Sequence, residues 1–200
     1  MRKITQDLEG HLSIGILGGS FNPAHRGHLE VTRAARHLLS LDRCWWLVSP
    51  GNPLKDPEGY APFEERFAAA EDLTRQFRWL TVSGMEQRLG TRFTVDTMRV
   101  LTARFRHARF VWLMGADSLA TFHLWRDWQA IAQMVPMAVI SRPGEQMAAL
   151  TSPAARALSR YRIPADEART LAARKAPAWV YLPVVHNPVS STEIREKRDP

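Results

Sequence analysis

Short apolar runs alternate with helical patterns along most of the chain. Six runs have the length of a strand buried on both faces of a sheet, and they occupy residues 12–17, 44–49, 79–83, 109–114, 137–141 and 178–185. Between them, apolar residues recur at intervals of three and four, as on the buried face of a helix. This spacing predicts helices over residues 25–39, 63–77, 94–105 and 128–134.

The alternation of strands and helices predicts the architecture. Parallel strands need a crossover connection, and the crossover is usually a right-handed helix. We therefore expect a Rossmann-like, doubly wound α/β fold, with a mainly parallel sheet and helices on both of its faces. In such a sheet, ligands bind at the carboxyl ends of the strands.

Nothing in the sequence marks a second independent domain. The 200 residues contain no internal repeat and no obvious linker, so one domain is expected, with its core in residues 12–143 and 178–196. The Ala- and Arg-rich segment 144–175 has a helical character, but Pro153 and Pro164 interrupt it because proline cannot continue a helix. We interpret this segment as a helical insertion or cover without catalytic residues.

The composition fits a compact protein, since 45% of the residues are hydrophobic and 24% are charged. No apolar run approaches the roughly 18 residues that a membrane span needs. Residues 1–10 are polar and carry acids, unlike a signal peptide, so we expect a cytoplasmic protein without a membrane partner. The single cysteine, Cys44, lies in an apolar run, which predicts a core position and excludes an internal disulfide.

The formal net charge is +7, from 27 Lys and Arg against 20 Asp and Glu. An excess of positive charge favours anionic partners such as nucleotides, polyphosphate or nucleic acid, and does not choose among them. Most of the basic residues are arginines scattered through Ala-rich stretches such as residues 154–174. This distribution is typical of solvated helix faces, and we expect no nucleic-acid partner.

The strongest candidate for chemistry is the segment 18–28, Gly-Gly-Ser-Phe-Asn-Pro-Ala-His-Arg-Gly-His, which directly follows the first strand. Glycines allow backbone amides to approach an anion closely. The helix that follows would point its unpaired amides, and the positive end of its dipole, at the same place. His25 and His28 are three residues apart, so both would lie on one face of its first turn. Together these features predict a polyphosphate site.

Competing interpretations of this loop have less support in the sequence. The chain contains neither the G-x-x-x-x-G-K-[ST] loop of P-loop proteins nor the G-x-G-x-x-G fingerprint of dinucleotide-binding folds. It also lacks an H-E-x-x-H arrangement or a nearby Cys or Asp that would make the two histidines a zinc site, so we expect no protein-bound metal. The alternative is that the histidines have no catalytic or binding role and are two surface residues of a capped helix.

The same segment resembles the H-x-G-H signature of the nucleotidylyltransferase superfamily. Its longer form, with Asn22 and Pro23, is similar to the nicotinate-nucleotide adenylyltransferase branch. Further segments resemble that branch in its own order, and they are residues 49–55, 93–97, 115–119 with Phe122 and Trp125, 141–144 and 190–195. The resemblance extends over almost the whole chain, from near residue 12 to near residue 196.

The resemblance implies three groups of site residues. The catalytic group would hold phosphates and stabilise charge as pyrophosphate leaves, and it consists of His25, His28 and Arg195. The group that binds ATP and its phosphates consists of Gly18, Gly19, Ser20, Phe21, Lys55, Ser191 and Thr192. The group that binds nicotinate mononucleotide consists of Thr94, Asp96, Thr97, Asp117 and Trp125, with the Trp125 ring stacked on the pyridine. For Asp117, an ordinary helix N-cap is the alternative.

The resemblance further implies an in-line attack of the mononucleotide phosphate on the α-phosphorus of ATP, with Mg²⁺ accompanying ATP. Because the nucleophile is already an anion, we expect no general base, only positioning and electrostatic stabilisation. A sister activity with nicotinamide mononucleotide, pantetheine phosphate or a cytidylyl acceptor stays open. So does a nucleic-acid-binding module without activity, which only the positive charge favours. The sequence does not decide whether the chain forms a homo-oligomer.

Overall fold

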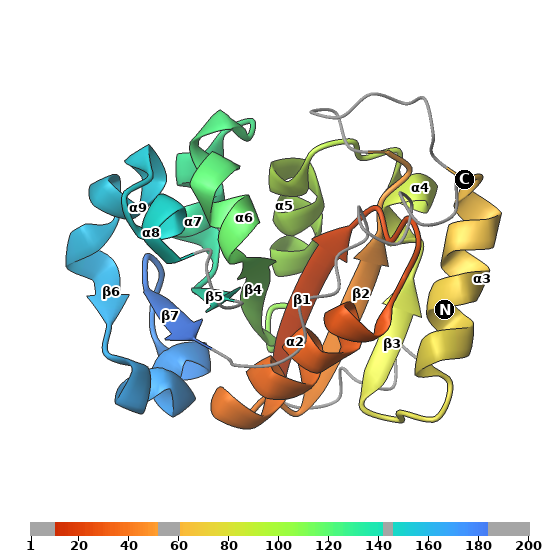
Figure 1. Ribbon diagram of the computed structural model, residues 1–200, viewed down its shortest axis with the longest axis horizontal. Coiled ribbons are helices and arrows are strands. Elements are labelled where there is room, and N and C mark those ends of the chain that lie inside the picture. Colours follow the sequence, from red (N-terminus) through yellow and green to blue (C-terminus); the bar gives the residue numbers. More distant parts are fainter. Residues whose placement is uncertain (1–10, 52–60, 142–145, 184–200) are drawn as a thin grey trace.

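A computed structural model describes residues 11–51, 61–141 and 146–183 of the chain. Within these ranges seven strands form one sheet in the order β3-β2-β1-β4-β5-β7-β6, and each neighbouring pair is parallel (Figure 1). The strands are β1 (Ser13–Gly19), β2 (Arg43–Val48), β3 (Leu80–Ser83), β4 (Arg109–Gly115), β5 (Met137–Ser141), β6 (Arg162–Ile163) and β7 (Trp179–Pro183). The predicted parallel α/β sheet is confirmed.

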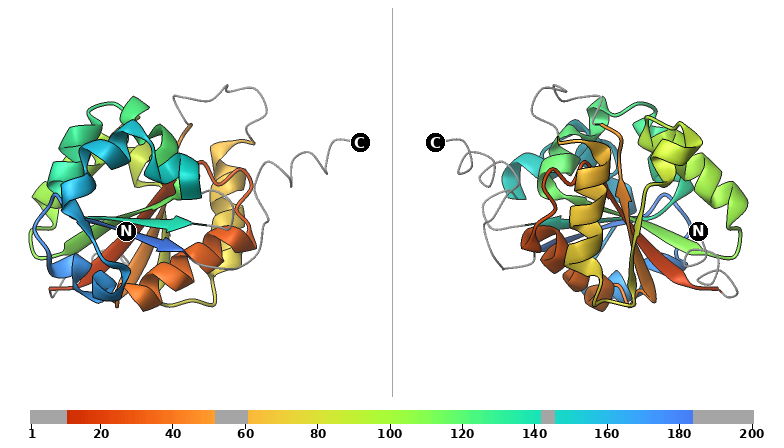
Figure 2. Two further views of the ribbon diagram at one scale, coloured as in Figure 1. Left: turned by 60° about the vertical axis from the view of Figure 1, so that its left-hand side comes forward. Right: turned by 90° about the vertical axis from the view of Figure 1, so that its right-hand side faces the viewer.

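Helices cover both faces of this sheet, which Figure 2 shows from two further sides. One buried cluster takes side chains from α2 (Arg26–Leu38), α3 (Phe63–Thr74) and the 3-10 helix η3 (Ala165–Ala173). The cluster on the opposite face takes side chains from α4 (Met85–Leu89), α5 (Thr94–Arg104), α6 (Ala116–Thr121), η1 (Phe122–Leu124), α7 (Trp128–Met134), α8 (Gln146–Leu150), α9 (Pro153–Ala157) and η2 (Ser159–Tyr161). None of the helices in the described ranges is long and apolar enough to cross a membrane.

Strand β2 shows why the central strands are apolar throughout. Trp45 belongs to the cluster that contains α5, Trp46 belongs to the cluster that contains α2, and neither side chain is exposed. Because both faces are covered, the strand has no polar side. Cys44 on the same strand is also fully buried, and burial raises the pKa of its thiol to about 12. The predicted core position of Cys44 is confirmed.

The segment 144–175 differs in part from the helical insertion that the sequence predicts. Its described part contains α8, α9 and η3, but also β6, which pairs with β7 at the edge of the sheet. Ser152 caps α9 by accepting a hydrogen bond from the Ala155 N–H at 3.2 Å, and Pro153 occupies the first turn, where no intrahelical N–H bond is lost. Pro164 separates β6 from η3. The prolines thus divide this segment into short elements.

The order of the strands places the loop after β1 at a point where ligands bind in doubly wound sheets. Strands β1 and β4 are neighbours, with Leu17 paired to Leu113. The helix after β1, α2, packs on one face of the sheet, whereas the helix after β4, α6, packs on the other. The two loops therefore leave the sheet edge in opposite directions. The glycine loop, residues 18–21, begins at this point with the last two residues of β1, Gly18 and Gly19.

Candidate active site

The glycine loop runs over the ring of Trp112, which belongs to the neighbouring strand β4. A Cβ atom on Gly18 would lie 2.5 Å from Cη2 of Trp112, so glycine alone fits there without rearrangement. A Cβ atom on Gly19 would lie 3.6 Å from the Phe21 ring, which is an ordinary van der Waals distance. The sequence predicts that both glycines allow close approach to an anion. At Gly18 the structure adds a packing requirement.

Replacing Gly18 with alanine should destabilise the protein by about 1–3 kcal/mol, because the buried Trp112 ring has little room to move. Urea unfolding at 25 °C measures the change in the free energy of unfolding. Gly19→Ala is the matched control, since its new methyl group makes contacts of ordinary length. Equal stability of the two variants would contradict the packing role of Gly18.

Phe21 turns the glycine loop toward α2. Its backbone φ is 47°, a left-handed conformation that residues other than glycine seldom adopt, and its side chain is buried. The ring stacks on Trp46 of β2 with the centroids 4.8 Å apart, and it lies 4.9 Å from the His28 ring. Packing on both sides therefore holds an unfavourable backbone conformation in place.

His25 and His28 lie at the amino end of α2, as the sequence predicts. His25 is the N-cap residue and is 7% exposed, His28 is half-buried, and their ring centroids are 3.9 Å apart. The backbone N–H of His25 donates to Nδ1 of His28 at 3.3 Å. This bond makes Nδ1 an acceptor, so in a neutral His28 ring the proton lies on Nε2. Because His25 is buried, the alternative of two surface histidines does not describe this pair.

A buried hydroxyl connects the first turns of α2 to β2. Thr32 is fully buried, and its Oγ1 donates to the His28 carbonyl at 2.7 Å. The same oxygen accepts the indole N–H of Trp46 at 2.8 Å. Trp46 therefore supports the site twice, through Thr32 and through its stack on Phe21. The position of the histidine pair thus depends on side chains in the core.

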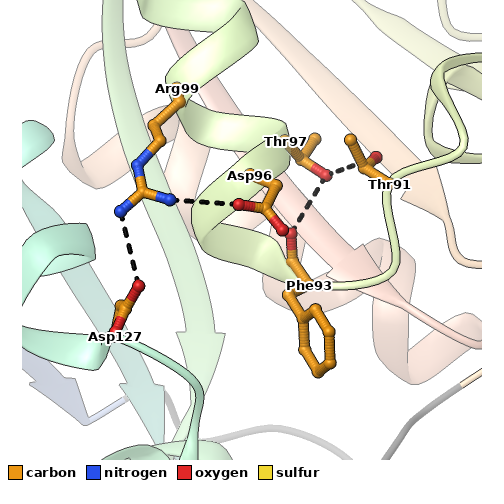
Figure 3. Close-up of polar contacts among 6 residues, drawn as sticks. All are labelled: Thr91, Phe93, Asp96, Thr97, Arg99 and Asp127. Carbon is orange, nitrogen blue, oxygen red and sulfur yellow. Dashed lines mark hydrogen bonds and ion pairs between the residues drawn. The ribbon is translucent and has the colours of Figure 1, made fainter.

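The residues expected to bind nicotinate mononucleotide begin at the first turn of α5. Thr94 is the first residue of this helix and is half-buried. Asp96 pairs with Arg99 at 3.1 Å, and Arg99 also reaches Asp127, next to α7, at 3.4 Å (Figure 3). These side chains are partly exposed, so each ion pair contributes only about 0–1 kcal/mol to stability. The carboxylate of Asp96 is engaged by the protein itself.

Thr97 lies inside the protein and carries two hydrogen bonds to side chains. Its Oγ1 lies 2.9 Å from Oγ1 of Thr91 and donates to Oε1 of Glu86 at 3.1 Å. Burial raises the pKa of the Glu86 carboxyl to about 7, although the hydrogen bond from Thr97 acts in the opposite direction. Thr97 is therefore better placed to hold the first turn of α5, and with it Thr94, than to touch a ligand.

Asp117 and Trp125 follow β4, the strand beside β1. Gly115 is the N-cap of α6 and Asp117 is the second residue of that helix, so the N-cap alternative for Asp117 is wrong. The Asp117 side chain is exposed. Trp125 is half-buried, and its ring centroid lies 6.2 Å from that of Trp112, the ring beneath Gly18. The structure thus brings both the glycine loop and Trp125 against one tryptophan.

Several predicted site residues lie outside the described residues and stay predictions. They are Lys55, Ser191, Thr192 and Arg195. The second phosphate clamp that the resemblance implies, formed by Ser191, Thr192 and Arg195, therefore rests on the sequence alone. Within the ranges that the structure describes, no three His, Cys, Asp or Glu side chains lie close enough to hold a metal ion.

Two buried charged residues near the site were missed by the sequence prediction, Arg66 and Glu86. Arg66 lies on α3 three residues after Phe63 and four before Ala70, and therefore on the apolar face of the helix. A charged residue on such a face is the signal that could have found it. Glu86 offered no such signal, because α4 is too short to show a helical period.

Comparison with known proteins agrees with this geometry. The model of the cytidylyltransferase-like family matches residues 16–197. A probable nicotinate-nucleotide adenylyltransferase of Bradyrhizobium sp. strain BTAi1 is 52% identical over 184 residues, which cover 92% of this chain and 95% of the relative. A protein of the same name from Rhizobium meliloti strain 1021 is 47% identical over 187 residues, which cover 94% of this chain and 99% of the relative.

Among solved structures, the Plasmodium falciparum nicotinic acid mononucleotide adenylyltransferase complexed with NaAD superimposes with a TM-score of 0.69. The match covers 93% of this chain and 83% of that chain at 16% sequence identity, so it supports the fold alone. The family follows from the relatives that are about half identical over nearly their whole length. The chain belongs to the nicotinate-nucleotide adenylyltransferases of the cytidylyltransferase-like family.

Proposed function

We propose that the protein transfers the adenylyl group of ATP to nicotinate mononucleotide, giving nicotinate adenine dinucleotide and pyrophosphate in NAD biosynthesis. One observation carries the proposal: the glycine loop and the paired histidines meet at the amino end of α2, beside β4. The names of the relatives support it. The Plasmodium neighbour, which is complexed with NaAD, shares the fold.

In the proposed reaction, an oxygen of the mononucleotide phosphate attacks the α-phosphorus of ATP, and the bond between that phosphorus and the oxygen that bridges to the β-phosphate breaks. The protein would hold the two anions in line and stabilise the charge that moves onto pyrophosphate. Proximity alone supplies roughly 7–11 kcal/mol in favourable cases. ATP would enter with a divalent cation, which we take to be Mg²⁺, an ion commonly held by substrate phosphates and water.

The described residues divide between the two substrates. His28 would donate Nε2–H to a phosphate oxygen of ATP, with His25 beside it. The main chain of residues 18–21 would bind the same nucleotide. Thr94, Asp117 and Trp125 would bind the nicotinate half, with Asp96 and Thr97 holding the first turn of α5. A second phosphate clamp would consist of Ser191, Thr192 and Arg195, and Lys55 would meet a phosphate as a separate point charge.

Pyrophosphate release by the purified protein tests the proposal. ATP and Mg²⁺ are supplied with nicotinate mononucleotide or, at equal concentration, with nicotinamide mononucleotide, and we expect release to favour the nicotinate form. No release with either acceptor would overturn the proposal. Turnover with pantetheine phosphate or a cytidylyl acceptor would then indicate a sister activity, and steeply salt-dependent nucleic-acid binding without turnover would indicate a binding module.

A further inference from the structure

Arg66 lies near the start of α3 and is 3% exposed, although its side chain is charged. Its guanidinium donates hydrogen bonds to four main-chain carbonyls. Nε donates to Ala61 at 2.9 Å. One terminal nitrogen donates to Ser20 and, at 2.9 Å, to Ser49, and the other donates to Pro50 at 3.0 Å.

These carbonyls belong to three segments that surround the proposed phosphate site. Ser20 is in the glycine loop after β1, Ser49 and Pro50 form the exit of β2, and Ala61 leads into α3. Further bonds join the same segments, because the Ser49 N–H donates to the Gly19 carbonyl at 2.9 Å. The Ala61 N–H likewise donates to Oδ1 of Asn22 at 3.1 Å. Arg66 contacts all three segments at once and clamps them together.

The clamp also sets the direction of neighbouring amides. In a trans peptide unit the C=O and the following N–H point in opposite directions. With the Ser20 carbonyl on Arg66, the N–H of Phe21 is turned away from the guanidinium. The N–H of Gly51 is turned away in the same manner, because the Pro50 carbonyl also accepts from Arg66. The N–H groups of Phe21 and Gly51 are therefore oriented toward the side of the loops that faces away from Arg66, where they could bind an anion.

Burying a guanidinium costs free energy that its hydrogen bonds must offset. An apolar side chain of similar volume could fill the same space but would leave these four carbonyls without their donor, so the arginine serves to hold the loops that carry them and not merely to pack the helix. We infer that Arg66 is a positioning residue for adenylyl transfer. It fixes the glycine loop and the exit of β2 in the arrangement that phosphate binding requires, and it acts on the reaction through these loops. The inference rests on the proposed function.

Steady-state kinetics of Arg66→Lys and Arg66→Met test this role. Lysine keeps the charge but lacks the planar fork that reaches several carbonyls, so it should not restore function. We expect both variants to lower kcat about ten- to hundredfold, with a nearly unchanged KM for nicotinate mononucleotide. Arg75→Met is the matched control, because Arg75 follows the same helix and its side chain is 79% exposed. The control should retain wild-type kcat.

Amide hydrogen exchange gives a readout that does not depend on activity. In Arg66→Lys, exchange should become faster in residues 18–21 and at Gly51, while the amides of β4 and β5 keep their protection. If the wild-type protein does not use nicotinate mononucleotide, the proposed function fails, and the exchange rates still test the clamp. Wild-type kcat in Arg66→Lys, or unchanged exchange in both loops, would overturn the inference. If Arg66→Met does not fold, the kcat and the exchange rates of Arg66→Lys alone test the inference.

Discussion

Replacing His28 with asparagine should lower kcat by about a hundred- to a thousandfold and leave the fold intact. Asparagine offers an oxygen near the position of Nδ1, so it can accept the His25 N–H and preserve the hydrogen bond at the N-terminus of α2. It has no N–H at the position of Nε2, which donates to phosphate in the proposed mechanism. Because negative charge grows on the leaving pyrophosphate, the missing donor should affect the transition state more than the bound substrate.

Pyrophosphate release under saturating substrates measures this effect, with circular dichroism to verify folding. His25→Ala and His28→Ala should also lose turnover by orders of magnitude, and His28→Ala loses the cap as well. His37→Ala is the matched control, since His37 is exposed in the last turn of the same helix. Near-normal turnover in both alanine variants would refute the role assigned to the pair.

Glu86 should make the free energy of unfolding depend on pH. Burial raises the pKa of its carboxyl from an ordinary 4.5 to about 7 in the folded protein. Below pH 4.5 the group holds its proton in both states and has no effect. As the pH rises toward 7 the unfolded chain releases the proton first, so folding becomes less favourable. At about 1.36 kcal/mol per pKa unit, the stability lost by pH 8 is on the order of 3 kcal/mol.

Glu86→Gln removes the titrating group and keeps an oxygen that can accept the Thr97 hydroxyl. Relative to wild type, the variant should gain on the order of 3 kcal/mol as the pH is raised from 4.5 to 8. Urea titrations across this range measure the gain. Glu71→Gln, at an exposed position of α3, is the control and should show no such trend. A difference between Glu86→Gln and wild type that is constant with pH would contradict a buried neutral carboxyl.

The long elements could be predicted from the sequence because their periodicity is local. The run that became β1 and the pattern that became α2 each contain enough residues to show a period. Strand β6 has two residues and α4 has five, so neither could be recognised. The pairing of β6 with β7 also depends on the rest of the sheet.

The site was predictable to the level of its motifs but not to the level of individual contacts. His25 and His28 are three apart on a helix, and that spacing alone places them together. Thr97 belongs to a motif with Thr94, yet its hydroxyl points inward to Glu86. The bonds of Arg66 join segments that only the folded chain brings together. Such contacts depend on tertiary structure, and no local pattern encodes them.

The position of β1 between β2 and β4 has a consequence for how the molecule is assembled. Ile14 pairs with Arg43 on one side and with Phe110 on the other. During synthesis β1 and β2 leave the ribosome well before β4, so one edge of β1 stays open and Gly18 has no Trp112 beneath it. The glycine loop is therefore translated early, but its packing against Trp112 is completed late. A nascent chain that has not yet extended through β4 carries the H-x-G-H motif without the site.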